Sequence, residues 1–131
     1  MVRHHRHRAQ PAVLVVEDDE DTAACVGEVL ATAGFTSHKA ANGMAALNYL
    51  AAHPAPSLIL LDLYMPIMDG RRMMQVLQSE PKWRRIPVVL VTADPDAKRR
   101  AVELHATAYL KKPVQDQDLL TMVDTALRYP T

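Results

Sequence analysis

The sequence has little of what would indicate a disulfide-stapled, membrane-bound or nucleic-acid-binding protein. Its 131 residues include one cysteine, so an internal disulfide is excluded. Lys and Arg total 15, as do Asp and Glu, so net charge gives no reason to expect a nucleic acid or an anionic membrane as partner. No apolar run is long enough to span a membrane, and the first residues lack the apolar core of a signal peptide. We therefore expect a cytoplasmic protein.

The chain is long enough for one domain, which at this size buries roughly 70% of the surface that the unfolded chain exposes. Residues 1–11 are rich in histidine and arginine and lack hydrophobic periodicity, which predicts a disordered tail before a folded domain over 12–131. Metal binding by histidines of this tail is the weaker interpretation, because nothing rigid fixes their geometry. Cys25 lies beside Val26 in a helical pattern, which favours a small buried side chain over a nucleophile.

The hydrophobic pattern alternates strand and helix five times. We expect strands over 12–16, 35–40, 58–61, 87–92 and 107–111, and helices over 21–33, from 42 to before Pro54, 71–79, 96–104 and 116–128. Short, continuous apolar runs such as Leu58–Leu61 are typical of parallel strands buried on both faces, whereas polar 35–40 belongs at an edge. This pattern predicts an α/β fold, a doubly wound five-stranded parallel sheet of order 2-1-3-4-5, flavodoxin-like, with five helices.

Four of the predicted strands end on residues that can carry chemistry. These are Glu17 and Asp18, then Asp62, Thr92 and Lys112. The carboxyl ends of parallel strands share one crevice, where open α/β sheets bind ligands. Three carboxylates there repel one another, and the usual remedy is a hard cation with oxygen ligands, here Mg²⁺, with Lys112 supplying further positive charge. Such a site suits phosphoryl transfer, with Asp62 as acceptor and Thr92 as hydrogen-bond donor.

Each of these residues alone has an ordinary interpretation. An aspartate after a strand is most often a helix cap or turn former, an acidic run favours a helix N-terminus, and a lone lysine is usually solvated. Thr92 and Tyr109 are both compatible with strand packing. The functional interpretation rests on the conjunction, because four separate strand ends would otherwise place compatible chemistry on one edge by accident.

The motifs V-L-V-V-E-D-D, D-L-Y-M-P-I-M-D-G, V-V-L-V-T-A and Y-L-K-K-P resemble the receiver domain of two-component response regulators, in particular the stand-alone chemotaxis-regulator type. The resemblance covers residues 12–128. It implies a phosphorylation-dependent signalling switch rather than an enzyme, phosphorylated by a sensor histidine kinase or a histidine phosphotransfer protein and acting on a downstream protein that the sequence does not identify. The implied roles are phosphoacceptor and metal ligand for Asp62, Mg²⁺ binding for Glu17, Asp18 and the Tyr64 backbone carbonyl, phosphoryl contact for Lys112, and a switch pair of Thr92 and Tyr109.

Two side chains near the implied site are expected to set the lifetime of the phosphorylated state. Tyr64, two residues after Asp62, is large enough to cover the approach of water, and Asp94, two residues after Thr92, could orient water. We expect the covering effect to dominate, so that a Tyr64→Asn variant loses phosphate severalfold faster. The chain departs from the family at His105-Ala106, where a glycine is usual before the last strand, which bears on the shape of the fourth helix.

Three rival functions fit the sequence less well. A nucleotide-binding fold needs a glycine-rich loop after the first strand, where this chain has E-D-D-E-D. Phosphatases of the haloacid dehalogenase type resemble D-x-D, whereas Tyr64 occupies the position of the second acid. A pseudo-receiver that has lost phosphorylation is disfavoured by the complete set of Glu17, Asp18, Asp62, Thr92 and Lys112. The output remains open between docking of the regulator on a target and relay of the phosphoryl group.

Overall fold

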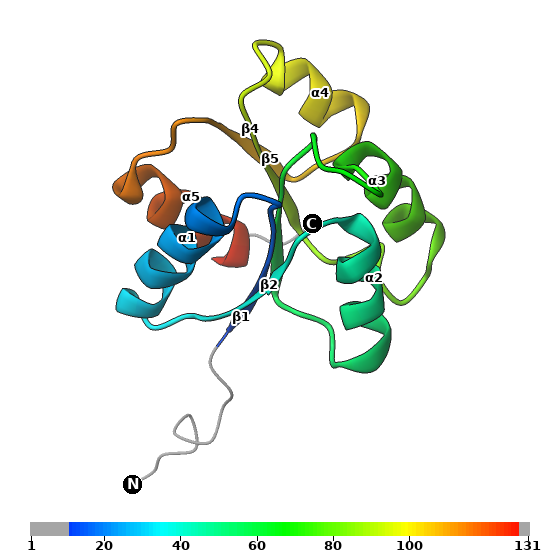
Figure 1. Ribbon diagram of the computed structural model, residues 1–131, viewed down its shortest axis with the longest axis horizontal. Coiled ribbons are helices and arrows are strands. Elements are labelled where there is room, and N and C mark those ends of the chain that lie inside the picture. The colour runs from blue at the N-terminus through cyan, green and yellow to red at the C-terminus, as the bar shows by residue number, and fades with distance from the viewer. Residues whose placement is uncertain (1–10, 129–131) are drawn as a thin grey trace, which may run out of the picture.

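All ten predicted elements form, and each strand bound lies within one residue of its prediction. The computed structural model describes residues 11–128 (Figure 1). The elements in order are β1 (Ala12–Val16), α1 (Glu20–Thr32), β2 (Thr36–Ala40), α2 (Gly43–Ala52), β3 (Leu58–Leu61), α3 (Gly70–Ser79), β4 (Val88–Thr92), α4 (Ala97–Glu103), β5 (Ala108–Lys111) and α5 (Asp116–Arg128).

The five strands make one parallel sheet in the order β2-β1-β3-β4-β5, which confirms the predicted fold. β1 and β3 are neighbours at the centre, and Val16 pairs with Leu61 at their carboxyl ends. At the other side of the sheet, Thr92 pairs with Lys111. The residues that follow these pairs therefore leave the sheet at the same edge, where the chain reverses its direction of winding.

Side chains of β3 alternate between two cores, because successive residues of a strand point to opposite faces. Ile59 and Leu61 pack in the core beneath α2, α3 and α4, and Leu58 and Leu60 pack in the core beneath α1 and α5. Figure 1 shows the same division, with α1 and α5 together on one side of the sheet. All four residues are buried, as the apolar run predicts.

Polar side chains fix where the helices begin. Asp19, Asn42 and Asp69 are the N-caps of α1, α2 and α3, and each accepts a hydrogen bond from the backbone N–H three residues further on. Such a cap is worth about 1 kcal/mol to a helix. After α1, Gly34 takes a φ of 92°, the left-handed conformation that commonly ends a helix.

One expectation about α1 is wrong. Cys25 is exposed, whereas the sequence pattern placed it among buried residues. The reason is that α1 fully buries only Ala23 and Leu30, and Cys25 lies on the flank of the helix that faces α5 across a cavity. The predicted tail, apart from Pro11, lies outside the described residues. No helix within residues 11–128 is long and apolar enough to cross a membrane.

Candidate functional site at the carboxyl edge of the sheet

Three of the predicted site residues are held by backbone hydrogen bonds that extend the sheet by one residue beyond the strands. The N–H of Glu17 donates to the Ala40 carbonyl at 3.0 Å, and that of Asp62 donates to the Val16 carbonyl at 3.1 Å. The N–H of Lys112 donates to the Thr92 carbonyl at 2.9 Å. Because the main chain is fixed at these positions, the side chains start from rigid points on one edge of the sheet.

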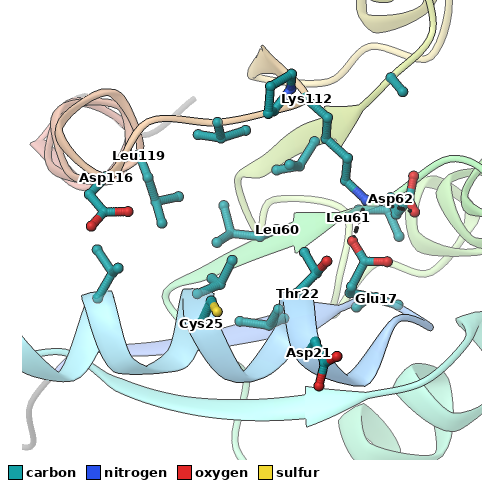
Figure 2. Close-up of a pocket in the computed structure, with 18 residues that line it drawn as sticks. Glu17, Asp21, Thr22, Cys25, Leu60, Leu61, Asp62, Lys112, Asp116 and Leu119 are labelled. Atoms are coloured by element: carbon teal, nitrogen blue, oxygen red, sulfur yellow. Dashed lines mark hydrogen bonds and ion pairs between the residues drawn. The ribbon is translucent and has the colours of Figure 1, made fainter.

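The Lys112 ammonium group, which follows β5, contacts the acids that follow β1 and β3. Its Nζ lies 2.5 Å from Glu17 Oε1 and 3.3 Å from Asp62 Oδ2 (Figure 2). Glu17 and Asp62 are each 7% exposed, while a quarter of the Lys112 side chain is exposed. Lysine thus bridges two buried carboxylates, and its outer part remains accessible from solvent.

Glu17, Asp18 and Asp62 form an acidic cluster that fits a divalent cation. One carboxylate oxygen from each residue lies within 4.8 Å of those of the other two. Asp18 is exposed, so the cluster opens to solvent. An all-oxygen, anionic donor set on a rigid edge matches the preference of Mg²⁺, which commonly keeps several waters beside one or two carboxylates. The residues present therefore fit the predicted metal.

Burial and charge act against each other in this cluster. Burial raises the pKa of Glu17 above its usual value, although the hydrogen bond from Lys112 opposes the shift. For Lys112, burial alone would lower the pKa, but the carboxylates of Glu17 and Asp62 outweigh it and raise the pKa. The lysine therefore stays charged at neutral pH and pairs with two carboxylates, while Asp18 adds a third acid to the cluster.

The loop after β3 is packed directly against the backbone of Asp62. The N–H of Gly70 donates to the Leu63 carbonyl at 2.9 Å. A Cβ atom at Gly70 would lie 2.4 Å from the Asp62 carbonyl oxygen and 2.9 Å from Leu63 Cα, so only glycine fits there. The sequence alone did not predict this role of Gly70 in supporting the site.

Thr92 and Tyr109 lie on the same face of the sheet. Thr92 is fully buried, and its hydroxyl oxygen accepts a hydrogen bond from the Asp94 N–H at 3.2 Å. Tyr109 is 37% exposed and pairs with Leu90 in the sheet. The alternation of β4 and β5 puts both on the side covered by α4, because their neighbours Val91 and Leu110 pack on the α1 and α5 side.

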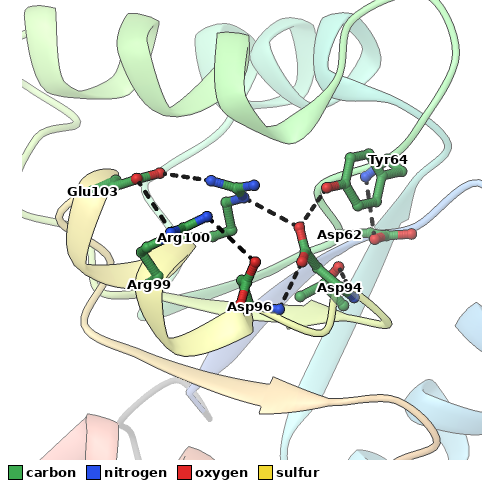
Figure 3. Close-up of polar contacts among 8 residues, drawn as sticks. Asp62, Tyr64, Asp94, Asp96, Arg99, Arg100 and Glu103 are labelled. Carbon is green, nitrogen blue, oxygen red and sulfur yellow. Dashed lines mark hydrogen bonds and ion pairs between the residues drawn. The ribbon is translucent and has the colours of Figure 1, made fainter.

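Tyr64 and Asp94, predicted as separate influences on the phosphorylated state, are bonded to each other. The Tyr64 hydroxyl donates to Asp94 Oδ2 at 2.5 Å, and the Tyr64 N–H donates to Asp62 Oδ1 at 3.3 Å (Figure 3). The Asp94 carboxylate raises the pKa of Tyr64, and the same bond lowers the pKa of Asp94. Arg100 of α4 also donates to Asp94. No sequence signal distinguishes Arg100 from its neighbour Arg99.

A cavity of about 530 Å³ lies between α1 and α5 and reaches Glu17, Asp62 and Lys112 at one end. Figure 2 shows Cys25 and Leu119 on its opposite walls. Its deeper lining is largely apolar side chains of the sheet and the two helices. Two further aspartates, Asp21 and Asp116, also line the cavity, and the lysine-bridged carboxylates occupy one end of it.

The fold and this edge define a class of protein, a doubly wound parallel sheet with an acidic, lysine-bridged site where the winding reverses. Residues 13–124 match the response regulator receiver domain family. Response regulator Rcp1 of Synechocystis is 36% identical in an alignment of 121 positions that covers 85% of this chain and 82% of that protein.

Solved structures agree. A putative response regulator of Chloroflexus aurantiacus superimposes with a TM-score of 0.87 at 28% identity, covering 92% of this chain and all of that one. The phosphorylated cyanobacterial phytochrome response regulator RcpA gives a TM-score of 0.75 at 31% identity, covering 89% of this chain and 91% of that one. The chain belongs to the response regulator receiver family, whose members are phosphorylated signalling domains of two-component systems.

Proposed function

We propose that Asp62 is the residue that accepts the phosphoryl group, with a histidine kinase or histidine phosphotransfer protein as donor. The observation that carries this assignment is that Asp62 Oδ2 lies 3.3 Å from the Lys112 ammonium group while Asp62 also shares the acidic cluster with Glu17 and Asp18. Two of the three acids contact Lys112; Asp62 follows β3, the middle strand of the sheet, whereas Glu17 follows β1.

In the transfer, a carboxylate oxygen of Asp62 attacks phosphorus, and the bond from phosphorus to the donor's imidazole nitrogen breaks. The leaving nitrogen keeps the electron pair, and with a proton on the other ring nitrogen of the donor a neutral imidazole leaves and an aspartyl phosphate forms. Lys112 is already within 3.3 Å of Asp62 Oδ2 and can move its ammonium group onto a phosphoryl oxygen. The rigid backbone at Asp62 holds the nucleophile in place, which is the main protein contribution to phosphoryl transfer.

Mg²⁺ bound by Glu17, Asp18 and Asp62, with the Tyr64 carbonyl as a further ligand, would supply positive charge toward the phosphoryl oxygens. Glu17 is also held by the Asp19 N–H, which donates to its Oε2 at 3.2 Å. Asp18 is the exposed member of the set, so it is the residue through which the cluster meets solvent. Thr92 and Tyr109 are proposed to read the phosphoryl group from the α4 side of the sheet.

Intact mass after incubation with acetyl phosphate and Mg²⁺ tests the assignment. We expect one added phosphoryl group on the wild-type protein, none on Asp62→Asn, and little when EDTA replaces Mg²⁺. Asp124→Asn is the matched control, because Asp124 is an exposed aspartate of α5 paired with Arg128, and it should take the label normally. Label that persists in Asp62→Asn, or that forms equally well in EDTA, would show that the assignment is wrong.

A further inference from the structure

An ion-paired chain of side chains connects the loop after Asp62 to helix α4. Asp94 Oδ2 receives both the Tyr64 hydroxyl at 2.5 Å and Arg100 Nε at 3.2 Å. Arg100 in turn contacts Glu103 Oε1 through its NH1 group at 3.1 Å. Figure 3 shows this line running from Tyr64 through Asp94 to α4. Tyr64 and Asp94 lie 30 residues apart in the chain, so their bond ties two separate loops at the site.

Asp94 is the most firmly held residue of this chain of contacts. Its side chain is 6% exposed, and its other oxygen accepts the Asp96 N–H at 2.8 Å. Among residues 11–128, Arg100 is the one cationic side chain paired with it. A nearly buried carboxylate with one charged partner depends strongly on that partner for its orientation.

Tyr64 has little else to hold its ring. The side chain belongs to a residue that is 60% exposed, and it is absent from both hydrophobic cores. Its backbone N–H is attached to Asp62 Oδ1, so the ring begins beside the nucleophile. The hydroxyl bonds to Asp94 and also interacts with the Arg100 side chain, so these two residues set the direction in which the ring points.

We infer that Arg100 is a positioning residue for the phosphorylation site, holding the Tyr64 ring in place through Asp94 and so prolonging the life of the aspartyl phosphate. This inference rests on the proposed role of Asp62. Asp94, bonded to Tyr64, Arg100 and Asp96, has its oxygens engaged and is poorly placed to orient a water. The pair therefore shields the phosphoryl group, and α4 controls how firmly it does so.

The test measures phosphate release from protein labelled with acetyl phosphate and Mg²⁺ and then freed of the donor. Arg100→Met, which keeps the aliphatic length without the charge, should release phosphate roughly threefold to tenfold faster, a range that corresponds to a small change in barrier. Arg99→Met is the matched control. Arg99 is the next residue of α4, contacts Asp96 and Glu103 but not Asp94, and is 64% exposed, so its loss should leave the rate unchanged.

Two further measurements separate positioning from a general loss of structure. In a Tyr64→Ala background, Arg100→Met should add no acceleration, because its effect passes through the missing ring. In the unphosphorylated protein, the NMR shifts of the Tyr64 ring should move in Arg100→Met and not in Arg99→Met.

The inference is overturned if Arg100→Met releases phosphate at the wild-type rate, or if its effect multiplies that of Tyr64→Ala. Unmoved Tyr64 ring shifts in Arg100→Met would overturn it as well. Each of these outcomes leaves Asp62 labelled and the proposed function intact. A wild-type protein that takes no label on Asp62 would instead contradict the proposed function itself.

Discussion

Two residues without the freedom of glycine occupy the left-handed region of backbone conformation. Ile67, in the loop after Asp62, has a φ of 69°, and His105, before β5, has a φ of 59°. The Met68 N–H donates to the Pro66 carbonyl at 2.7 Å across Ile67, which closes a tight turn. His105 lies in the turn between α4 and β5, and α4 still forms before it. The strain is greater at Ile67, because a β-branched side chain tolerates this region least.

Ile67→Gly should therefore raise the free energy of unfolding. The left-handed conformation costs roughly 1–2 kcal/mol for a residue with a Cβ. Against this gain, glycine lowers the free energy of unfolding by about 0.4–1 kcal/mol, because it gives the unfolded chain more conformational freedom. Little packing is lost, since Ile67 is 83% exposed, so the net gain should be up to about 1.6 kcal/mol. Urea unfolding with an unchanged m-value would measure it. His105→Gly should gain less, and a destabilised Ile67→Gly protein would contradict the strain argument.

At the scale of elements, sequence reasoning succeeded where geometry is dictated by the fold. Strand ends of a parallel sheet converge, so Glu17, Asp62 and Lys112 could be placed together from their positions after apolar runs. Prediction from the sequence failed where the outcome depends on which neighbouring groups a side chain contacts. Cys25 follows a helical apolar pattern, yet the space between α1 and α5 leaves it exposed. The hydrogen bond from Tyr64 to Asp94 joins two loops and depends on the side-chain rotamers of both residues. The hydrophobic periodicity of the sequence carries no information on these rotamers.

The start of α3 also supports the nucleophile. Gly70→Ala would set a Cβ 2.4 Å from the Asp62 carbonyl oxygen, and backbone atoms there cannot swing aside. Overpacking of this kind costs about 1–3 kcal/mol, and the shift should slow labelling of Asp62 by acetyl phosphate. Gly27→Ala is the control, because its Cβ meets only the Ser37 hydroxyl, at 3.3 Å, and alanine favours the helix. Equal stability and labelling in the two variants would contradict this role for Gly70.

The hydrogen bond between Tyr64 and Asp94 of the β4–α4 loop predicts that the free energy of unfolding depends on pH in the acid range. The Tyr64 hydroxyl bond, then the Asp96 N–H, lowers the pKa of Asp94 below its usual value. The unfolded state therefore binds a proton at higher pH than the folded state, and the stabilisation is complete above the unfolded pKa, about 3.9. It is lost as pH falls through the folded value.

The stability gap between wild type and Asp94→Asn should accordingly be constant from about pH 5 to 7 and narrow below about pH 4. Unfolding free energies measured by denaturant at each pH, in EDTA, would show this. Tyr64→Phe removes the hydrogen bond that is the largest cause of the lowered pKa of Asp94. When both proteins carry Tyr64→Phe, the stability gap between them should therefore narrow less below about pH 4. A gap that stays constant down to about pH 3 would contradict the assignment.

At the scale of the whole molecule, the site lies between two unlike faces. On the side of α1 and α5, a largely apolar cavity reaches the phosphorylation edge. On the side of α4, Arg100 is paired with Asp94, and Thr92 and Tyr109 lie on this face of the sheet. Thr92 is buried on the α4 side of the sheet, and its hydroxyl accepts a hydrogen bond from the Asp94 N–H. A change at Asp62 that alters the hydrogen bonding of Thr92 should therefore act first on the α4 side.

Beryllofluoride, which stands in for the phosphoryl group on an aspartate, should reveal this direction of coupling in the intact protein. With Mg²⁺ present, it offers new acceptor atoms to the Thr92 hydroxyl, which draws the β4–α4 loop toward Asp62 and leaves space that the Tyr109 ring can fill. Backbone NMR shifts should therefore spread from Asp62 through Thr92 to α4 and β5. Thr92→Ala keeps the metal site but lacks the hydroxyl, so its shifts should end near the site. Wild-type shifts confined to Glu17, Asp18 and Asp62 would show that the phosphoryl group and the α4 face are not coupled through Thr92.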